Sequence, residues 1–382
     1  MKKFIILLLI LTFIVPFNVK ADEEYLKNAK SGILMEYTTG SILYDKNKDD
    51  RVSIASLTKM MTGLIILEKI DEGVIKWNDI ITTSSYASSM GGTQIWLSTG
   101  EKISVEDLFK SMFMASANDA AVALAEAVSG SEENFVKLMN AKKEELKLKN
   151  TEFKNCTGFD EEGHFSSAYD LAVIARELLK HDEILKYTSV YEDYIRKDTP
   201  NKYWLVNTNK LVRFYEGADG FKTGFTDDAL YTIAATAKRN NLRLIAIVLG
   251  SPSGSNRNEE AMELLDDGFF HYKIDLVKSK GEIVDKLKID KGNVDYIDVE
   301  VKDELSVLSK KSDASINYDT KIYYDQISLP IKKGDKIGKI DILYNGKVLK
   351  SSDLCASNDV KKVNYFKYLF SDLKNVMSGN FF

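Results

Sequence analysis

The stretch of sequence that decides the fold is SLTKMMTGLIIL, residues 56–67. Its apolar residues fall on nearly every face of a helix, and a helix that is hydrophobic all round is buried at the centre of a domain. Ser56 and Lys59 lie near its beginning and, being three positions apart, share one face. Serine is a weak nucleophile without a nearby base, and a lysine can be that base where burial and positive neighbours disfavour its ammonium form. The stretch therefore predicts a central buried helix that carries an activated serine.

The chain around this helix combines helical and strand patterns, so we expect an α/β (α+β) fold. Helical patterns occur at 105–114, 119–128, 132–148, 169–179 and 259–271, and strand patterns at 32–37, 41–44, 231–237 and 242–249. Beyond about residue 275, short β-type runs alternate with Gly and Asp/Lys turns. We predict a first domain over 22–275 and a small β-rich domain over 276–358.

The N-terminus has the features of an export signal. Lys2 and Lys3 precede an almost wholly apolar run, 4–15, and Val19-Lys20-Ala21 is a small-residue cleavage site. An uncleaved membrane anchor is the alternative, but a span needs roughly 20 apolar residues and this run is shorter. We expect residues 1–21 to be removed, and the loss of three lysines then changes the formal net charge from −5 to −8.

The last residues, 359–382, have the pattern of an amphipathic helix. Seven apolar side chains fall on one face, namely Val363, Phe366, Leu369, Phe370, Leu373, Val376 and Met377. The segment holds four Lys against two Asp, although the whole chain is acidic. A basic amphipathic helix suits an anionic membrane surface, and packing against the protein itself is the alternative. We favour the membrane because the segment is terminal and ends in Phe381-Phe382.

Charge and composition argue against several classes of function. A nucleic-acid-binding protein would have a basic excess, and this chain has a net charge of −5. Its three histidines, His164, His181 and His271, fit no metal motif. Cys156 and Cys355 are too few for a cysteine-rich zinc site; a disulfide between them is the alternative to the two free thiols that we expect. We therefore expect neither a metal nor an organic cofactor.

Two further short motifs bring polar groups that could work with the serine. Ser116-Ala117-Asn118 follows a helical pattern; its hydroxyl can relay a proton to a leaving group, and its amide can bind a peptide. Lys222-Thr223-Gly224 leads into the strand-rich part. Its lysine can keep Lys59 neutral or hold a substrate carboxylate, its threonine can hydrogen-bond that carboxylate, and its glycine lets a substrate approach the backbone. Ser371 and Lys374 repeat the first spacing, but in the tail.

Together, S-x-x-K, S-x-N and K-T-G are the active-site signature of penicillin-binding proteins and class A β-lactamases. In its longer motifs the chain resembles the low-molecular-mass D-alanyl-D-alanine carboxypeptidases over roughly residues 30–270. The runs that carry the resemblance are 40–47, 54–62, 100–130, 155–159 and 164–172. The β-rich domain and the amphipathic tail fit the same family's layout.

The resemblance implies a β-lactamase/transpeptidase-like catalytic domain with a central antiparallel sheet flanked by helices. It implies a serine D-Ala-D-Ala carboxypeptidase that removes the terminal D-alanine from peptidoglycan stem peptides and is acylated by β-lactams. Such an enzyme works at the outer face of the cytoplasmic membrane, in the cell wall.

The resemblance also implies a role for each motif residue. Ser56 is the nucleophile, Lys59 the base, and the backbone N–H groups of Ser56 and Phe225 form the oxyanion hole. The residues around the cleft are Ser116 and Asn118 on one side, and Lys222, Thr223 and Gly224 on the other. Arg257 matches an arginine near the site of the substrate's terminal carboxylate; an exposed arginine in a salt bridge is the alternative.

Two positions depart from the family's pattern. Cys156 stands where proline is usual, which we expect to affect only a turn. Leu230 stands where glycine is common after K-T-G, and can reshape one wall of the site.

Other functions and mechanisms compete with the carboxypeptidase. A β-lactamase would need a deacylating glutamate, for which we find no convincing counterpart. A cross-link endopeptidase or transpeptidase could use the same site, and a protein of the same fold could bind wall peptides without turnover. A Ser-His-Asp triad through His164 is disfavoured because the chain has no G-x-S-x-G elbow.

Overall fold

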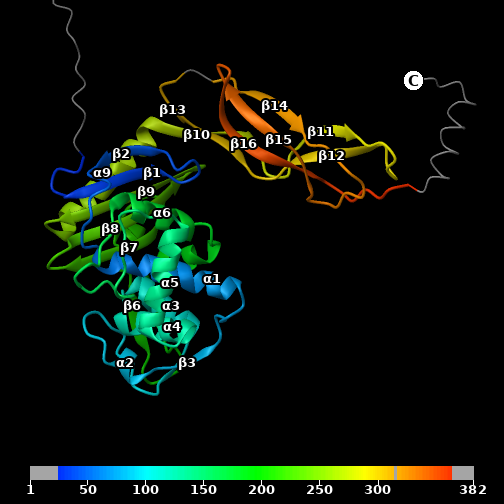
Figure 1. Ribbon diagram of the computed structural model, residues 1–382. Coiled ribbons are helices and arrows are strands. Elements are labelled where there is room, and N and C mark those ends of the chain that lie inside the picture. The colour runs from blue at the N-terminus through cyan, green and yellow to red at the C-terminus, as the bar shows by residue number, and fades with distance from the viewer. Residues whose placement is uncertain (1–24, 314–315, 364–382) are drawn as a thin grey trace, which may run out of the picture.

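A computed structural model of the chain describes residues 25–313 and 316–363. It has a larger part built of helices and a sheet, followed by a smaller part built of strands (Figure 1). The predicted signal peptide, 1–21, lies outside the described residues, as does the predicted tail helix from residue 364 onward.

A five-stranded antiparallel sheet forms the centre of the larger part, in the order β2-β1-β9-β8-β7. Its strands are β1 Ser31–Glu36, β2 Ile42–Lys46, β7 Ala218–Thr226, β8 Leu230–Arg239 and β9 Leu242–Ser251. Helix α9 (Gly254–His271) packs on one face, and α6 (Ala168–Leu178) packs on the other (Figure 1). Because helices cover both faces, the inner strands are buried on both sides. The predicted central antiparallel sheet flanked by helices is confirmed.

The predicted central helix is also confirmed, with one refinement. A 3₁₀ turn, η1 (Ala55–Thr58), leads into α1 (Lys59–Asp71), and every residue from Lys59 to Leu67 is buried. The helices around α1 are α3 Val105–Met114, α4 Asn118–Ser129, α5 Glu132–Glu145 and α6. Ser56 therefore lies in the 3₁₀ turn that opens the helix.

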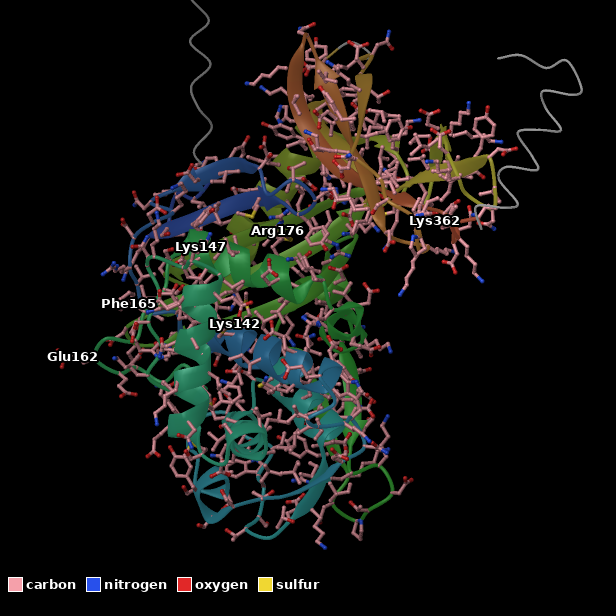
Figure 2. The ribbon with its side chains drawn as sticks, turned by 45° about the vertical axis from the view of Figure 1, so that its right-hand side comes forward. Lys142, Lys147, Glu162, Phe165, Arg176 and Lys362 are labelled. Carbon is pink, nitrogen blue, oxygen red and sulfur yellow. The ribbon has the colours of Figure 1, made fainter. Side chains whose placement is uncertain are left out.

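Short elements complete the larger part: β3 Ile80–Thr82, α2 Ser85–Ser88, β4 Lys102–Ser104, η2 Asp182–Ile184, α7 Leu185–Thr188, β5 Glu192–Ile195, β6 Tyr203–Val206 and α8 Leu211–Phe214. Hydrogen bonds between residues far apart in the sequence hold the layers together. Arg176 of α6 donates from Nε to the Tyr37 carbonyl at 2.6 Å and from Nη2 to the Thr38 carbonyl at 3.1 Å (Figure 2). The arginine thereby ties α6 to the turn between β1 and β2.

Strand β7 is the one strand of the central sheet that the sequence patterns did not reveal. Its residues, ADGFKTGFT, include two glycines and few β-branched side chains, so they carry a weak strand signal. Pairing with β8 nevertheless holds them extended, with Lys222 opposite Ala234 and Gly224 opposite Thr232. The K-T-G motif therefore lies within an edge strand of the central sheet, against η1.

The smaller part is β-rich, as predicted, with its own apolar core. It contains a two-stranded sheet, β10-β13, and a five-stranded sheet in the order β11-β12-β16-β15-β14. Its strands are β10 Tyr272–Lys278, β11 Ile283–Lys288, β12 Tyr296–Val301, β13 Leu305–Lys310, β14 Asp319–Tyr324, β15 Lys336–Tyr344 and β16 Lys347–Ala356.

Both ends of this part differ from the expected boundaries of 276 and 358. It begins with β10 at Tyr272, and Val360 forms a β-bridge with Ile331. Lys362 bridges Gly292 in the same way. Residues 359–362 are extended because Val360 is buried in the second core, so the expected helix does not begin at 359.

Among the described residues, no helix is long and apolar enough to cross a membrane, and no group of three His, Cys, Asp or Glu side chains could hold a metal ion. Cys156 lies in the larger part and Cys355 on β16, and both are free thiols.

Candidate active site

The predicted serine and lysine meet at the beginning of the buried helix. Lys59 is the first residue of α1 and is 0% exposed, and its Nζ lies 3.0 Å from the Ser56 Oγ. The 3₁₀ turn carries the hydroxyl onto the same face as the amine, as the spacing of three predicts. Ala55, just before the serine, has a φ of +48°. An alanine in this left-handed conformation is strained, which is common beside functional groups that the surrounding structure holds in place.

The Lys59 amine has two further hydrogen-bond acceptors. Its Nζ donates to the Asn118 Oδ1 at 2.7 Å and to the Thr157 carbonyl at 2.6 Å. The contact with Asn118 brings together the first two motifs, which lie 59 positions apart in the chain. Thr157 was missed as a functional residue because its contribution is a backbone carbonyl. The only sequence signal for it is its place in the run 155–159, which carries part of the family resemblance.

Burial is the main cause that brings the Lys59 amine close to neutrality. It lowers the pKa of Lys59 to about 7, against the opposing influence of Cys156 and Asp119. A lysine with this pKa is in large part uncharged at neutral pH, so it can accept the proton of a neighbouring hydroxyl.

Lys222, on β7, is a second buried amine in the same region. It is 0% exposed, and its Nζ donates to the Thr223 carbonyl at 2.8 Å. Burial lowers the pKa of Lys222 well below its usual value, and the charges of Lys59 and Arg257 lower it further. We expected Lys222 to keep Lys59 neutral; burial is the largest cause of the lowered pKa of each amine, and the two positive charges also disfavour each other.

Arg257 lies in the first turns of α9, on the side of Lys222. It is 8% exposed, and its Nε and Nη2 donate to the Asn258 Oδ1 at 3.2 and 3.0 Å. Burial lowers its pKa to about 10. The alternative of an exposed arginine in a salt bridge is therefore wrong. A buried guanidinium close to Lys222 gives this end of the site an excess of positive charge, which suits a carboxylate ligand.

Asn118 is held by the segment that precedes the second motif. Its Nδ2 donates to the Gly91 carbonyl at 2.9 Å, and its backbone N–H donates to the Thr93 carbonyl at 2.8 Å. The next residue, Asp119, is fully buried and accepts the backbone N–H groups of Ile95 and Leu97. These contacts hold the amide side chain with its oxygen toward Lys59.

Ser116 and Thr223 are both buried to 6% exposure, one between α3 and α4 and the other on β7. Ser116 has a φ of +65°, a strained conformation that the close connection of the two helices imposes. Within the described part of the chain, no hydrogen bond joins the hydroxyl of either residue to Ser56 or Lys59. A place for Ser116 and Thr223 in the active site therefore stays a prediction.

Two glycines let the backbone pack closely around Ser56. A Cβ on Gly224 would lie 2.9 Å from the Ser56 nitrogen and 2.6 Å from the Thr232 Oγ1. A Cβ on Gly158 would lie 1.9 Å from the Ala55 carbonyl oxygen, and its φ of +88° also favours glycine. The backbone of Ser56 is therefore enclosed between β7 and the 155–159 segment. Phe225 follows Gly224, and its exposed ring packs on Tyr231 with centroids 4.5 Å apart.

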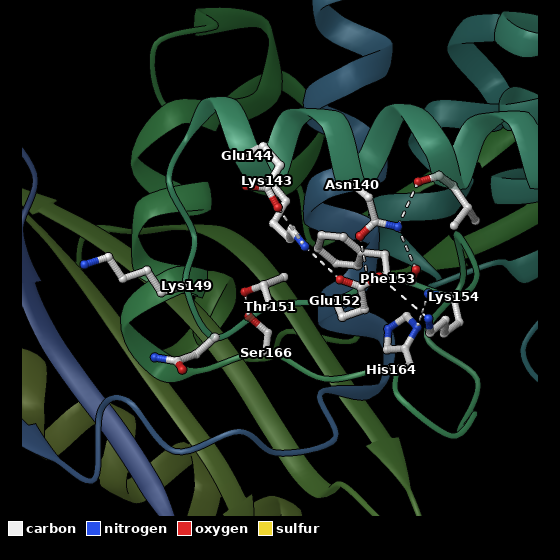
Figure 3. Close-up of polar contacts among 12 residues, drawn as sticks. Asn140, Lys143, Glu144, Lys149, Thr151, Glu152, Phe153, Lys154, His164 and Ser166 are labelled. Carbon is white, nitrogen blue, oxygen red and sulfur yellow. Dashed lines mark hydrogen bonds and ion pairs between the residues drawn. The ribbon is translucent and has the colours of Figure 1, made fainter.

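His164 has a structural role. Its Nε2 lies 2.8 Å from the Thr58 Oγ1. Its Nδ1 accepts the Lys154 backbone N–H at 3.1 Å (Figure 3). Thr58 already donates to the Ala55 carbonyl, so it accepts the Nε2 proton of a neutral imidazole. Burial lowers the pKa of His164 to about 4. With both ring nitrogens engaged away from Ser56, the Ser-His-Asp triad is excluded.

The two departures from the family pattern have local structural reasons. Cys156 has a backbone N–H, which proline lacks, and this group donates to the Glu132 Oε1 at 2.9 Å. Leu230 begins β8 with a φ of +55°, a left-handed conformation that explains why glycine is common there. For a leucine it costs roughly 1 kcal/mol. The effect of Leu230 on a wall of the site stays a prediction.

Comparison with known proteins identifies both parts of the chain. Residues 18–253 match the family described as D-alanyl-D-alanine carboxypeptidase, and residues 272–362 match the penicillin-binding protein 5 C-terminal domain. The chain is 44% identical to the D-alanyl-D-alanine carboxypeptidase DacF of Bacillus subtilis, over 95% of this chain and 94% of that protein. It is 31% identical to the D-alanyl-D-alanine carboxypeptidase DacC of Escherichia coli, over 89% and 86% of the two chains.

Solved structures agree with this grouping. Penicillin-binding protein 5 from Haemophilus influenzae superposes with a TM-score of 0.71 and 31% identity, covering 88% of this chain and 98% of that one. Penicillin-binding protein D2 from Listeria monocytogenes, in its ampicillin-bound form, superposes with a TM-score of 0.55 and 32% identity, covering 63% and 97%.

Proposed function

The chain belongs to the D-alanyl-D-alanine carboxypeptidase family, and we propose that Ser56 is the nucleophile and Lys59 the base of its reaction. The protein is a serine-type carboxypeptidase that removes the terminal D-alanine from peptidoglycan stem peptides, and β-lactams acylate it. It acts outside the cytoplasm, where peptidoglycan lies.

In the proposed reaction, the Ser56 Oγ attacks the carbonyl carbon between the two terminal D-alanines while Lys59 takes up the hydroxyl proton. The backbone N–H groups of Ser56 and Phe225 stabilise the tetrahedral oxyanion. The C–N bond then breaks, and the proton passes through Ser116 to the departing D-alanine amine. Water attacks the resulting ester, which releases the shortened peptide and restores the hydroxyl.

We assign substrate binding to the other motif residues and to Arg257. Lys222, Arg257 and the Thr223 hydroxyl hold the terminal carboxylate. Asn118 binds the peptide backbone, and the missing side chain at Gly224 leaves room for the substrate beside β7. A β-lactam presents a carboxylate and an acyl carbon in a similar arrangement, so it enters the same site.

The observation that carries this proposal is the hydrogen bond of 3.0 Å between the Ser56 hydroxyl and the fully buried Lys59 amine. An amine whose pKa burial lowers to about 7 is matched to proton transfer at neutral pH. No other described group near Ser56 combines this proximity with this basicity.

The decisive test is the covalent adduct. Intact-protein mass spectrometry with penicillin should show a penicilloyl adduct on the natural chain and none on Ser56→Ala. An assay with a D-Ala-D-Ala peptide should show release of D-alanine by the natural chain and none by Ser56→Ala. Ser371→Ala is the matched control, because Ser371 and Lys374 repeat the S-x-x-K spacing in the tail; it should keep full reactivity.

Other results would point elsewhere. An adduct on Ser56→Ala would refute the assignment of the nucleophile. Rapid loss of the penicilloyl group from the natural chain would indicate a β-lactamase, and a stable adduct without D-alanine release would indicate a binding protein.

Export and membrane attachment are also proposed. The apolar run 4–15 and the cleavage site at 19–21 support removal of residues 1–21, and the basic amphipathic pattern of 359–382 supports attachment to an anionic membrane surface. N-terminal sequencing of the exported protein tests the first. Deleting 364–382, which keeps the β-bridges of Val360 and Lys362, tests the second by release from membrane fractions.

A further inference from the structure

We propose that Glu132 is a positioning residue of the active site: its carboxylate joins the two loops that supply the acceptors of the Lys59 amine. The inference rests on the proposed role of Lys59 as the base. Glu132 is the first residue of α5, and neither its side chain nor its helix belongs to the three motifs.

The first loop runs from 153 to 159. It supplies the Thr157 carbonyl, which accepts from the Lys59 Nζ at 2.6 Å. The neighbouring Cys156 donates its backbone N–H to the Glu132 Oε1 at 2.9 Å, and its carbonyl accepts the Thr62 hydroxyl at 2.7 Å. The peptide groups on either side of Cys156 are therefore both engaged, one by α5 and one by α1. A substitution of Glu132 can therefore shift the Thr157 carbonyl, because only Cys156 lies between the two contacts.

The second loop runs from 84 to 92 and includes the short helix α2 (Ser85–Ser88). Tyr86 donates its hydroxyl to the Glu132 Oε2 at 2.6 Å. Five residues later, the Gly91 carbonyl accepts the Asn118 Nδ2 at 2.9 Å, and the same side chain presents its Oδ1 to Lys59. Glu132 thus closes a ring of contacts that begins and ends at the Lys59 amine, through Thr157 on one side and Asn118 on the other.

The position of Glu132 makes its carboxylate a firm anchor. It lies at the N-terminus of α5, where the free N–H groups of the helix favour a negative charge, and Ser131 caps the helix by accepting the Asn134 N–H at 3.2 Å. Further along α5, Asn140 pairs with the start of the first loop. Its Oδ1 accepts the Phe153 N–H at 3.1 Å, and its Nδ2 donates to the Phe153 carbonyl at 2.8 Å (Figure 3). Helix α5 therefore holds this loop at two points, and only Glu132 also reaches the second loop.

Removing the carboxylate should loosen both loops and admit water to the amine. The charged and titratable groups that face Lys59 are Lys222 from β7, Asp119 from α4 and the Cys156 thiol from the first loop. All three remain in a Glu132 variant. A rise in the pKa of Lys59 would then report the loss of burial, because loss of the two acceptors alone would lower this pKa.

The experiment measures acylation by a fluorescent penicillin from pH 5 to 9, together with the thermal midpoint, on the full exported chain. Glu132→Ala should acylate about tenfold more slowly at pH 7, and the midpoint of its rising limb should move up by about one pH unit. Glu132→Gln, which keeps one acceptor oxygen, should recover part of the rate. Glu133→Ala is the matched control, because Glu133 is the next residue on the same turn and is exposed; it should behave as the natural chain.

Tyr86→Phe keeps the test decisive if Glu132→Ala fails to fold. Its ring is 48% exposed, so loss of the hydroxyl removes the contact with the second loop and little else; acylation should slow about threefold. Glu132→Ala or Tyr86→Phe with natural rates and an unmoved pH midpoint would overturn the proposal, even if the thermal midpoint fell. Failure of the proposed function looks different, because the natural chain itself would then show no adduct on Ser56.

Discussion

The close packing of β7 against Ser56, the proposed nucleophile, predicts a large catalytic effect from one added methyl group, in Gly224→Ala. The backbone of Gly224 does not have a positive φ, so the change acts through space alone. The new Cβ would lie 2.9 Å from the Ser56 nitrogen, 3.0 Å from the Ala55 Cβ and 2.6 Å from the Thr232 Oγ1, against about 3.4 Å for an ordinary contact. Strand β7 and the η1 turn must therefore separate by about half an ångström.

This separation moves the two proposed N–H donors of the oxyanion hole apart, because Ser56 lies on η1 and Phe225 on β7. Loss of one well-placed donor costs about 10²–10³-fold in rate, so we expect acylation to slow by about 100-fold. Overpacking should lower the free energy of unfolding by about 1–3 kcal/mol.

Stopped-flow acylation by a fluorescent penicillin and urea unfolding measure these two quantities. Gly254→Ala is the control: at the same end of the sheet, its Cβ would meet only Tyr231, at 3.6 Å, and the Arg257 Nη2, at 4.0 Å. A Gly224→Ala enzyme that acylates within twofold of the natural rate would refute the reasoning, because the contact would then not set the position of the nucleophile.

Three further predictions concern buried titratable groups. The rate of acylation should rise about tenfold per pH unit up to pH 7 and level off above, because only neutral Lys59 accepts the proton and burial lowers its pKa to about 7. A rate that does not change with pH would contradict this assignment, and Lys59→Arg should be inactive. The pKa of His164 is lowered to about 4 from an ordinary 6.5, so the unfolded state binds the proton first. The contribution of His164 to the free energy of unfolding should therefore be constant above pH 6.5 and fall by up to about 3 kcal/mol by pH 4. Urea titrations measure this fall, and the same fall in His164→Gln would show that His164 is not its cause. Burial raises the pKa of the Cys156 thiol well above its usual value, so a thiol reagent should label it only in the unfolded protein, as peptide mass spectrometry can show; labelling in the native state would contradict its burial.

The sequence by itself determined the elements whose signal is local. The apolar run 56–67 specified a central helix, and the spacing of Ser56 and Lys59 specified a hydroxyl beside an amine, because helix geometry alone puts residues i and i+3 together. The α3 pattern, 105–114, matches the observed bounds because its apolar period is strong and Ser104 caps it. The three motifs in their order then indicated the family.

Only the tertiary structure decided how these local pieces cooperate. Strand β7 has little strand propensity of its own, and its pairing with β8 fixes the place of the K-T-G motif. The Thr157 carbonyl has no sequence signal beyond its place in the run 155–159, since a carbonyl belongs to every residue. The Glu132 carboxylate has none, since a surface-like glutamate is common at the start of a helix. The basicity of Lys59 is likewise a property of the fold, because it depends chiefly on how completely other segments exclude water from the amine.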